Sequence, residues 1–329
     1  MSLDKIDFKI LYNLDYNARI SLTDLSKAAG ISKQNLNYRL KRLVRENVIL
    51  GFMSVIDIHQ LGHLTYRIYF RYKNVDEHKE KEILQYFQKH KNVLWLVSLS
   101  GSWDIEVVFT ARNYIHLNNI FKKVKEDLGQ YFSKYNVSAS IFNYHFKRDY
   151  LLNKKREDFS PKYYGFEPQE ISLDELDTNI LIELSENCRQ NNQEIARKLG
   201  VTYHTIKNRI ESLEKKKIIA SHRITIDLDK INRKYYKALI VLKNPTKDEE
   251  KKLYTFCAQY NIVTYLVEVL GDWQLEIETE VQNQEEFTEL LRKIRNNFPE
   301  LIVDYDILQL TKEHKLNYLP MGKGILNKS

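Results

Sequence analysis

The sequence predicts an α+β protein built from one unit written twice, each unit having three helices followed by a β-α-β-β-α-β segment. Two observations lead to this prediction. The first is an internal repeat at a constant offset of 170 residues: Leu3-Asp4-x-x-Asp7-x-x-Ile10-Leu11 returns as Leu173-Asp174-x-x-Asp177-x-x-Ile180-Leu181. The second is the apolar spacing, which changes from helical to strand-like midway through each copy. We expect the offset to shift by about two residues near residue 130.

Composition narrows the class of protein. The 329 residues suit about two domains or a repeated pair, and 43% apolar with 29% charged residues exclude wholesale disorder. No apolar run is long enough to predict a membrane span, and the N-terminal residues do not predict a secretory peptide. The sequence has only two cysteines, which exclude a disulfide framework. We therefore expect a cytoplasmic protein without metal or cofactor. The net charge of +7 and the pI of about 9.0 favour a polyanionic partner.

The first three helices of each copy predict a helix-turn-helix. Ser21 caps the second helix, Gly30 ends it, and Ser32 caps a third helix that runs to about residue 46. The second copy uses Asn191 and Thr202 as caps. The β-like residues after each third helix predict a two-stranded wing. Inward positions of the third helices are predicted at Leu36, Leu40, Leu43 and Val44, and at Ile206, Ile210 and Leu213.

The outer faces of the third helices carry the candidate residues for reading the major groove. Amide side chains can pair with adenine, and Arg or Lys can contact guanine or phosphate. Residues 1–50 hold nine Lys/Arg against five Asp/Glu, whereas residues 171–220 hold eight of each, so we expect the first copy to supply more non-specific affinity. The alternative is a solvated charged helix. The candidates are Lys33, Gln34, Asn37, Tyr38, Arg39, Lys41, Arg42 and Arg45, with Tyr203, His204, Lys207, Asn208, Arg209 and Lys215.

The second half of each copy predicts a ferredoxin-like sandwich. One face of such a sheet is covered by helices, and the open face needs a partner, which the other copy can provide. We therefore expect the two sandwiches of one chain to pair as a pseudo-dimer. Pairing of sandwiches from two chains is the alternative. The strands are expected at about 66–73, 93–100, 104–110 and 137–146, and at about 235–243, 263–270, 274–280 and 302–311. The helices are expected at about 77–90, 113–128, 246–259 and 283–297.

Each copy resembles the Lrp/AsnC-type (feast/famine) transcription regulators. Besides the opening repeat, the motifs that carry the resemblance are Gly30-Ile31-Ser32, Arg39-Leu40-x-x-Leu43 and Val48-Ile49, and Gly200-Val201-Thr202, Arg209-Ile210-x-x-Leu213 and Ile218-Ile219. The resemblance implies sequence-specific binding to double-stranded DNA, self-association through the sandwiches, and tuning by an amino acid or small metabolite. The family's glycine before the Val-Ile pair is replaced by Asn47 and Lys217, and Asn tolerates the left-handed conformation better than Lys does.

The resemblance also implies an effector site at the turn between the two middle strands of each sandwich. There the glycine permits close backbone approach, the indole forms an apolar wall, and Asp104 can accept from an α-ammonium group. The alternative is a tight hairpin whose tryptophan belongs to the core. The candidate effector residues are Gly101, Ser102, Trp103 and Asp104, with Gly271, Asp272 and Trp273.

Two other functions fit the same layout. Sirohaem decarboxylases use paired units of similar appearance, but the expected His-Asn-Tyr signature is missing from residues 59–67. The second alternative function is an assembly scaffold whose helix-turn-helix units do not bind DNA. His59 and His63 have metal-like spacing, but Gly62 breaks the helix they would need. We expect no enzyme, and the expected domains are residues 1–60, 61–152, 172–230 and 231–320, with a linker at 153–171 and a tail at 321–329.

Overall fold

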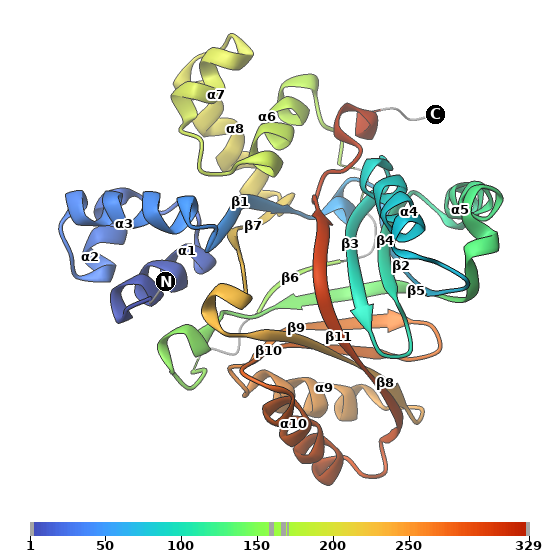
Figure 1. The fold of residues 1–329 in the computed structure, drawn as a ribbon. Helices are drawn as coiled ribbons and strands as arrows, with labels where there is room; N and C mark the ends of the chain where they lie inside the picture. The colour runs from blue at the N-terminus through green and yellow to red at the C-terminus, as the bar shows by residue number, and fades with distance from the viewer. Residues whose placement is uncertain (1–2, 158–160, 166–168, 170, 327–329) are drawn as a thin grey trace.

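The computed structural model describes residues 3–157, 161–165, 169 and 171–326. It confirms the predicted α+β class: two three-helix units stand beside a closed barrel of strands that carries helices on its outside (Figure 1). The predicted linker and tail lie partly outside the described residues. The helices of the two three-helix units are α1 (Lys5–Tyr16), α2 (Leu22–Ala29) and α3 (Lys33–Arg45), and α6 (Glu175–Glu186), α7 (Asn192–Leu199) and α8 (Tyr203–Lys215).

Capping residues set the helix boundaries in both units. Asp4 and Asp7 form a capping box at α1, and the hydroxyls of Ser32 and Thr202 accept from the third backbone N–H of α3 and α8. Gly30 adopts φ 73° between α2 and α3, which makes the tight turn of the helix-turn-helix. The inward leucines of α3 are buried as predicted, but Val44 is 41% exposed, because the helix turns its side chain away from α1 and α2.

The wing is shared between the two copies. Each copy supplies one strand, β1 (Ile49–Ile56) or β7 (Ile219–Ile226), and the two pair antiparallel with Ser54 opposite His222. The expectation of a separate two-stranded wing in each copy is therefore wrong. A single strand leaves its backbone groups unpaired, and the equivalent strand of the other copy pairs with them.

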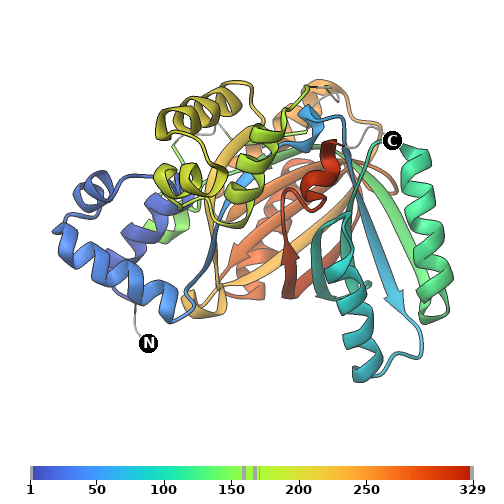
Figure 2. The ribbon, with the colours of Figure 1, turned by 90° about the horizontal axis from the view of Figure 1, so that it is seen from above.

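The two predicted sandwiches join into one closed barrel. The strand order is β2-β4-β3-β11-β8-β10-β9-β5, and β5 returns to pair with β2 (Figure 2). The seams between the copies are the pairs β5–β9 and β11–β3, so the sheets meet within the chain. The strands are β2 (Leu64–Tyr72), β3 (Val93–Ser100), β4 (Ile105–Ala111), β5 (Phe132–His145), β8 (Lys234–Leu242), β9 (Val263–Leu270), β10 (Leu275–Val281) and β11 (Ile302–Leu316).

The repeat offset of 170 residues holds along the barrel as far as Asn143 and Glu313, and it becomes 171 beyond them. Tyr66 pairs with Ala139 in the first copy, and Tyr236 pairs with Gln309 in the second, which keeps 170 residues between equivalent positions. The shift of about two residues expected near residue 130 is therefore wrong. A shift of one residue occurs instead near the end of β11, where a bulge makes Leu316, opposite Trp95, equivalent to His145, opposite Tyr265.

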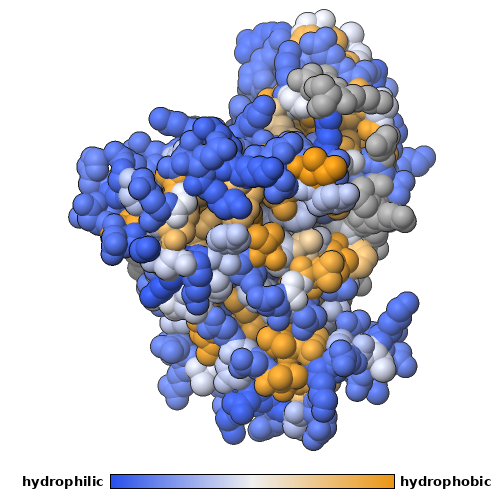
Figure 3. Space-filling view, turned by 90° about the vertical axis from the view of Figure 1, so that its right-hand side faces the viewer, coloured by the Kyte–Doolittle hydropathy of each residue, from blue (hydrophilic) through white to orange (hydrophobic). Residues whose placement is uncertain are grey.

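Helices cover the outside of the barrel. Helices α4 (Glu77–Lys89) and α5 (Tyr114–Leu128) pack on one half, and α9 (Lys247–Ala258) and α10 (Gln284–Asn297) pack on the other, each pair around its own apolar core. A third core runs from both three-helix units through the β1–β7 ribbon into the barrel. Hydrophilic side chains cover most of the face that carries α4 and α5, with smaller apolar patches between them (Figure 3).

The segments outside the two copies also have structure. The predicted linker contributes the short strand β6 (Lys162–Tyr164), which pairs with β5. The predicted tail contains a 3-10 helix, Gly322–Leu326, whose Lys323 lies 3.3 Å from Glu175 at the start of α6. Among the described residues, no helix is long and apolar enough to cross a membrane.

Candidate nucleic-acid interface and central cavity

Most of the predicted reading residues project from the outer faces of α3 and α8. Tyr38 is an apolar ring among them, with 64% of its surface exposed. The same positions of the two helices carry different side chains, Gln34 against His204 and Asn37 against Lys207. The exposed candidates are Lys33, Gln34, Asn37, Tyr38, Lys41 and Arg45 on α3, and Tyr203, His204, Lys207, Asn208 and Lys215 on α8.

The remaining arginine candidates hold the third helix to the first helix of the same unit. Arg39 donates to Asp4 and Asp7 at 2.8 and 2.9 Å. Arg42 donates to Asp7 at 2.6 Å. In the second copy, Arg209 makes the corresponding pairs with Asp174 and Asp177 at 2.7 and 3.2 Å. The recurrence of these ion pairs explains the repeated acid and arginine motifs as structural, because they fix the orientation of α3 and α8.

Reciprocal hydrogen bonds hold the two helix-turn-helix units together. The guanidinium of Arg19 donates to the Cys188 carbonyl at 2.5 Å, and that of Arg189 donates to the Ala18 carbonyl at 2.6 Å. Helix α1 packs on β7, and α6 packs on β1. Each unit therefore rests on the strand that the other copy supplies, which is the arrangement expected around a pseudo-twofold axis.

The two Gly-x-Trp turns lie at the seams of the barrel. A Cβ on Gly101 would come within 2.8 Å of the Ile307 carbonyl on β11, and one on Gly271 would come within 2.8 Å of Ser138 on β5. Polar residues of the turns bond across the same seams: Ser102 donates to Asp306, and Asn136 donates to Asp272 at 2.6 Å. These glycines are thus required where the copies approach each other most closely.

The other groups of these turns also have partners inside the protein. The Asp104 carboxylate accepts from Arg71 at 3.1 Å and from the backbone N–H of Tyr72 at 2.6 Å. Both tryptophans are buried, and the Trp273 indole donates to Glu276 at 3.0 Å. This geometry favours the core alternative for the tryptophans, and an effector at these turns stays a prediction.

A buried ion network joins the copies inside the barrel. Arg67 and Lys237 are equivalent at the offset of 170, as are Glu106 and Glu276. Arg67 donates to Glu106 at 2.8 Å and to Glu276 at 2.9 Å, while Lys237 donates to them at 2.6 and 3.0 Å. Burial acts to raise the pKa of Glu276, but Arg67 and Lys237 outweigh it and hold that pKa below its usual value.

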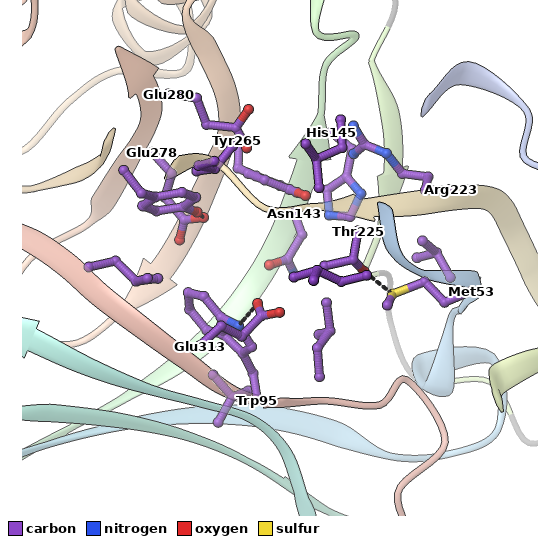
Figure 4. Close-up of a pocket in the computed structure, with 18 of the residues that line it drawn as sticks. Met53, Trp95, Asn143, His145, Arg223, Thr225, Tyr265, Glu278, Glu280 and Glu313 are labelled. Carbon is purple, nitrogen blue, oxygen red and sulfur yellow. Dashed lines mark hydrogen bonds between the residues drawn. The ribbon is translucent and has the colours of Figure 1, made fainter. Parts of the chain in front are cut away.

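A cavity of about 690 Å³ lies between this network and the β1–β7 ribbon (Figure 4). Residues from both copies line it: Trp95, Asn143 and His145 come from the first, and Tyr265 and Glu278 come from the second. The ribbon contributes further lining residues. Within the described part of the chain, four buried polar atoms at this cavity have no hydrogen-bond partner: Thr65 Oγ1, Asn143 Nδ2, His145 Nε2 and Arg223 Nη1.

One wall of the cavity connects directly to the first helix-turn-helix. Asp15 of α1 accepts from Arg148 at 2.5 Å and from Arg223 at 2.9 Å, and all three side chains are buried. Burial acts to raise the pKa of Asp15, but the two guanidinium groups outweigh it and hold that pKa below its usual value. On the other side, Arg148 also donates to Glu280 at 2.7 Å.

Sequence reasoning missed the cavity residues, although one signal was present. The stretch Leu275–Val281 alternates apolar residues with Glu276, Glu278 and Glu280. Such alternation is typical of a strand with one solvated face. Closure of the barrel instead turns this polar face inward, so all three glutamates are buried.

No metal centre is supported by the histidine pair. His59 is buried and bonds to Asp57 at 2.9 Å, while His63 bonds to the Leu61 carbonyl at 3.0 Å. Among the residues that the structure describes, no group of three or more His, Cys, Asp or Glu side chains is arranged to hold a metal ion. Both imidazole rings are engaged by neighbouring residues of the same turn.

Comparisons with known proteins place both three-helix units among DNA-binding domains. Residues 3–49 match a winged helix-turn-helix DNA-binding family, and residues 173–214 match the AsnC-type helix-turn-helix domain. An uncharacterised HTH-type transcriptional regulator of Pyrococcus furiosus is 34% identical over 129 residues, which cover 39% of this chain and 83% of that protein. The chain belongs to the Lrp/AsnC-type transcription regulators and carries the family's unit twice.

Two further relatives show the range of the similarity. The proline dehydrogenase transcriptional activator of Rhizobium radiobacter is 36% identical over 105 residues, covering 31% of this chain and 66% of that protein. Along nearly the whole chain, the structure is similar to that of the siroheme decarboxylase NirDL, with a TM-score of 0.64 and 14% identity over 98% of this chain and 97% of that one. At that identity the likeness shows a shared tandem fold.

Proposed function

We propose that this protein is a DNA-binding transcription regulator whose single chain presents two helix-turn-helix units to one duplex as a pseudo-dimer. The observation that carries the proposal is the reciprocal contact between the units. Arg19 and Arg189 each bond a carbonyl of the other copy, and the shared ribbon fixes the distance between α3 and α8. The location that follows is the cytoplasm, where such regulators meet DNA.

The two units do not offer the same reading surface. At equivalent positions, Gln34 faces DNA where the second copy has His204, and Lys41 is replaced by Glu211, which lies 3.8 Å from Lys207. A carboxylate repels phosphate but can accept from a cytosine amino group. We therefore propose an operator of two unlike half-sites, about one or more helical turns apart, rather than a palindrome.

Selection of bound duplexes from a random pool tests the operator. The expected result is one recurring site with two different halves, protected by one chain per site. A strictly palindromic site that binds two first-copy helices from different chains would overturn the pseudo-dimer. Association of pseudo-dimers into larger assemblies stays a prediction, and sedimentation of the DNA-free protein checks it.

A salt titration on the selected duplex tests the phosphate contacts. Replacing Lys33 and Lys41 with Ala is expected to flatten the slope of log K against log salt by about two, at about 0.9 for each phosphate that is no longer neutralised. Arg42 is unsuitable because it holds α3 to Asp7. The matched control replaces Lys81 and Lys123 on the outer helices of the barrel, which removes the same charge. An unchanged slope in the first variant would reject α3 as the main electrostatic contact.

The competing function is a siroheme decarboxylase on the same architecture. The shared fold and the central cavity are compatible with it, but the relatives similar in sequence are regulators. We therefore propose that the chain is not an enzyme. Addition of an iron-uroporphyrin to the purified protein, followed by its absorption spectrum and by release of carbon dioxide, tests this. Stoichiometric binding with gas release would establish the enzyme.

A further inference from the structure

The geometry points to the central cavity as a binding site for one small organic carboxylate per chain, carried on a flat and largely apolar body. The size is suitable, because about 690 Å³ falls within the range of pockets that enclose small molecules. The site differs from the Gly-x-Trp turns and lies inside the barrel, under the β1–β7 ribbon. Its ligand class follows from the polar atoms that face it and from its aromatic walls.

The first argument is the set of buried polar atoms that lack partners. Arg223 uses Nε and Nη2 to hold Asp15 and the Phe146 carbonyl, and its Nη1 has no partner among the described residues. The Asn143 amide accepts from Arg67 at 3.4 Å through its oxygen, which leaves its Nδ2 without an acceptor there. Buried polar groups without partners cost free energy, so a native site that keeps several of them calls for an explanation.

The second argument is that these groups can all donate a hydrogen bond. Arg223 Nη1 and Asn143 Nδ2 are donors, and the Thr65 hydroxyl can donate. Burial, together with the nearby Arg223 and Arg148, holds the pKa of His145 well below its usual value, so this ring is neutral and can also donate. In Figure 4 the side chains of Asn143, His145 and Arg223 lie on one side of the cavity. Two obligate donors, Arg223 Nη1 and Asn143 Nδ2, beside two groups that can donate are suited to the oxygens of a carboxylate.

The third argument is the aromatic part of the lining. Trp95 and Tyr265 occupy equivalent positions of the two copies and both line the cavity. The Tyr265 ring meets the His145 ring edge-on at 4.4 Å. Aromatic walls with a few convergent donors favour a flat apolar ligand body with one anionic group.

The fourth argument gives the stoichiometry. Residues of both copies line the cavity, yet its polar groups do not repeat: Asn143 of β5 corresponds to Glu313 of β11, and His145 corresponds to Leu316. Glu313 is engaged by the Trp95 indole, which donates to it at 2.7 Å. The donor set therefore exists once per chain, and we expect one ligand per chain.

The position of the site also suggests how a ligand would act, and this step rests on the proposed function. Arg223 lies on the ribbon and holds Asp15 of α1. A ligand carboxylate that accepts from Arg223 Nη1 competes with Asp15 for the same guanidinium group. Its binding therefore alters the hydrogen bonds between the ribbon and the first helix-turn-helix. Ligand binding is measurable without DNA, and DNA binding without ligand, so the two proposals fail separately.

The experiment uses the full chain and 2-naphthoate as the probe, titrated by calorimetry with its neutral amide as the matched ligand. The expected result is one naphthoate per chain and binding of the amide weaker by about tenfold or more, since a hydrogen bond to a charged group is removed. Stoichiometry other than one, equal binding of the amide, or no heat up to about 1 mM naphthoate would overturn the assignment.

Two threonines of the same cavity supply matched variants. Thr65→Val removes a hydroxyl that has no partner among the described residues, whereas Thr225→Val removes one that already contacts the Met53 sulfur at 3.8 Å. We expect Thr65→Val and Asn143→Leu to weaken naphthoate binding, and Thr65→Val to do so without lowering the melting temperature of the free protein. Thr225→Val should bind as the wild type does. Unchanged binding in Asn143→Leu, with the fold intact by circular dichroism, contradicts the proposal.

Discussion

Lys237 is the residue whose replacement tests the buried network most directly. Its ammonium group lies 2.6 Å from Glu106, 3.0 Å from Glu276 and 3.1 Å from Glu278, and all four side chains are buried. Lys237→Met keeps the length of the side chain but removes the charge. Breaking a buried ion pair by removing one partner costs about 3–5 kcal/mol, because a charge is left without compensation. We expect a loss of that size in the free energy of unfolding at pH 7.

The assay is urea unfolding followed by the fluorescence of the three buried tryptophans, with variants compared at equal m-values. Lys234→Met on the same strand is the control, since its ion pair with Asp229 is exposed to solvent and such a pair is worth about 1 kcal/mol or less. If Lys237→Met costs no more than this control, the network contributes little and the reasoning is refuted.

A second variant and the pH dependence separate charge from packing. Without Lys237, only Arg67 compensates Glu106, Glu276 and Glu278. Adding Glu106→Gln to Lys237→Met removes one of these three carboxylates, so we expect part of the lost stability to return. Burial already raises the pKa of Glu106 against the pull of Lys237 and Arg67. Without Lys237, this pKa rises further above its unfolded value, so the folded variant binds the extra proton. The loss should therefore shrink as pH falls and grow as pH rises through the raised pKa.

Three further predictions address the turns, the thiols and the seams. Lys217 has φ 58°, so Lys217→Gly should stabilise the protein by about 0.5–1 kcal/mol in urea unfolding, and no gain would show that the turn is unstrained. Burial raises the pKa of both Cys188 and Cys257 to about 12, so a disulfide reagent at pH 8 should label them only after unfolding; rapid labelling of the native protein would contradict this. Gly101→Ala should lower the melting temperature, because φ is +136° and the added carbon meets the Ile307 carbonyl at 2.8 Å, whereas Gly51→Ala, with open space around it, should not.

Much of the fold could be predicted from the sequence because its signals are local. The expected strand 93–100 is observed as Val93–Ser100, and the expected helix 77–90 is observed as Glu77–Lys89. Caps such as Ser32 and turn glycines such as Gly30 act within a few residues. The pairing of β1 with β7 could not be predicted in this way, because the ladder joins residues about 170 positions apart and neither strand specifies its partner.

The candidate site could also be predicted only where its signals are local. Helical geometry alone places Gln34, Asn37 and Tyr38 on the exposed face of α3, which the structure confirms as accessible. It does not show that Arg39 is engaged by the N-terminus of α1, since that contact depends on the packing of two helices. The cavity depends on closure of the barrel, which converts a polar strand face into an interior.

The interior charges explain why the two copies work as one chain. Glu280 of the second copy is compensated by Arg148, but the equivalent of Arg148 in the second copy is Leu319. In the same way, Asp15 of the first copy is held by Arg223, whose equivalent in the first copy is Met53. Two identical second copies would therefore bury Glu280 without its guanidinium, at a cost of several kcal/mol per charge on the order found for buried ions. Each copy supplies the counter-charges that the other lacks, so the covalent tandem allows an unsymmetrical interior that a dimer of identical units would not tolerate.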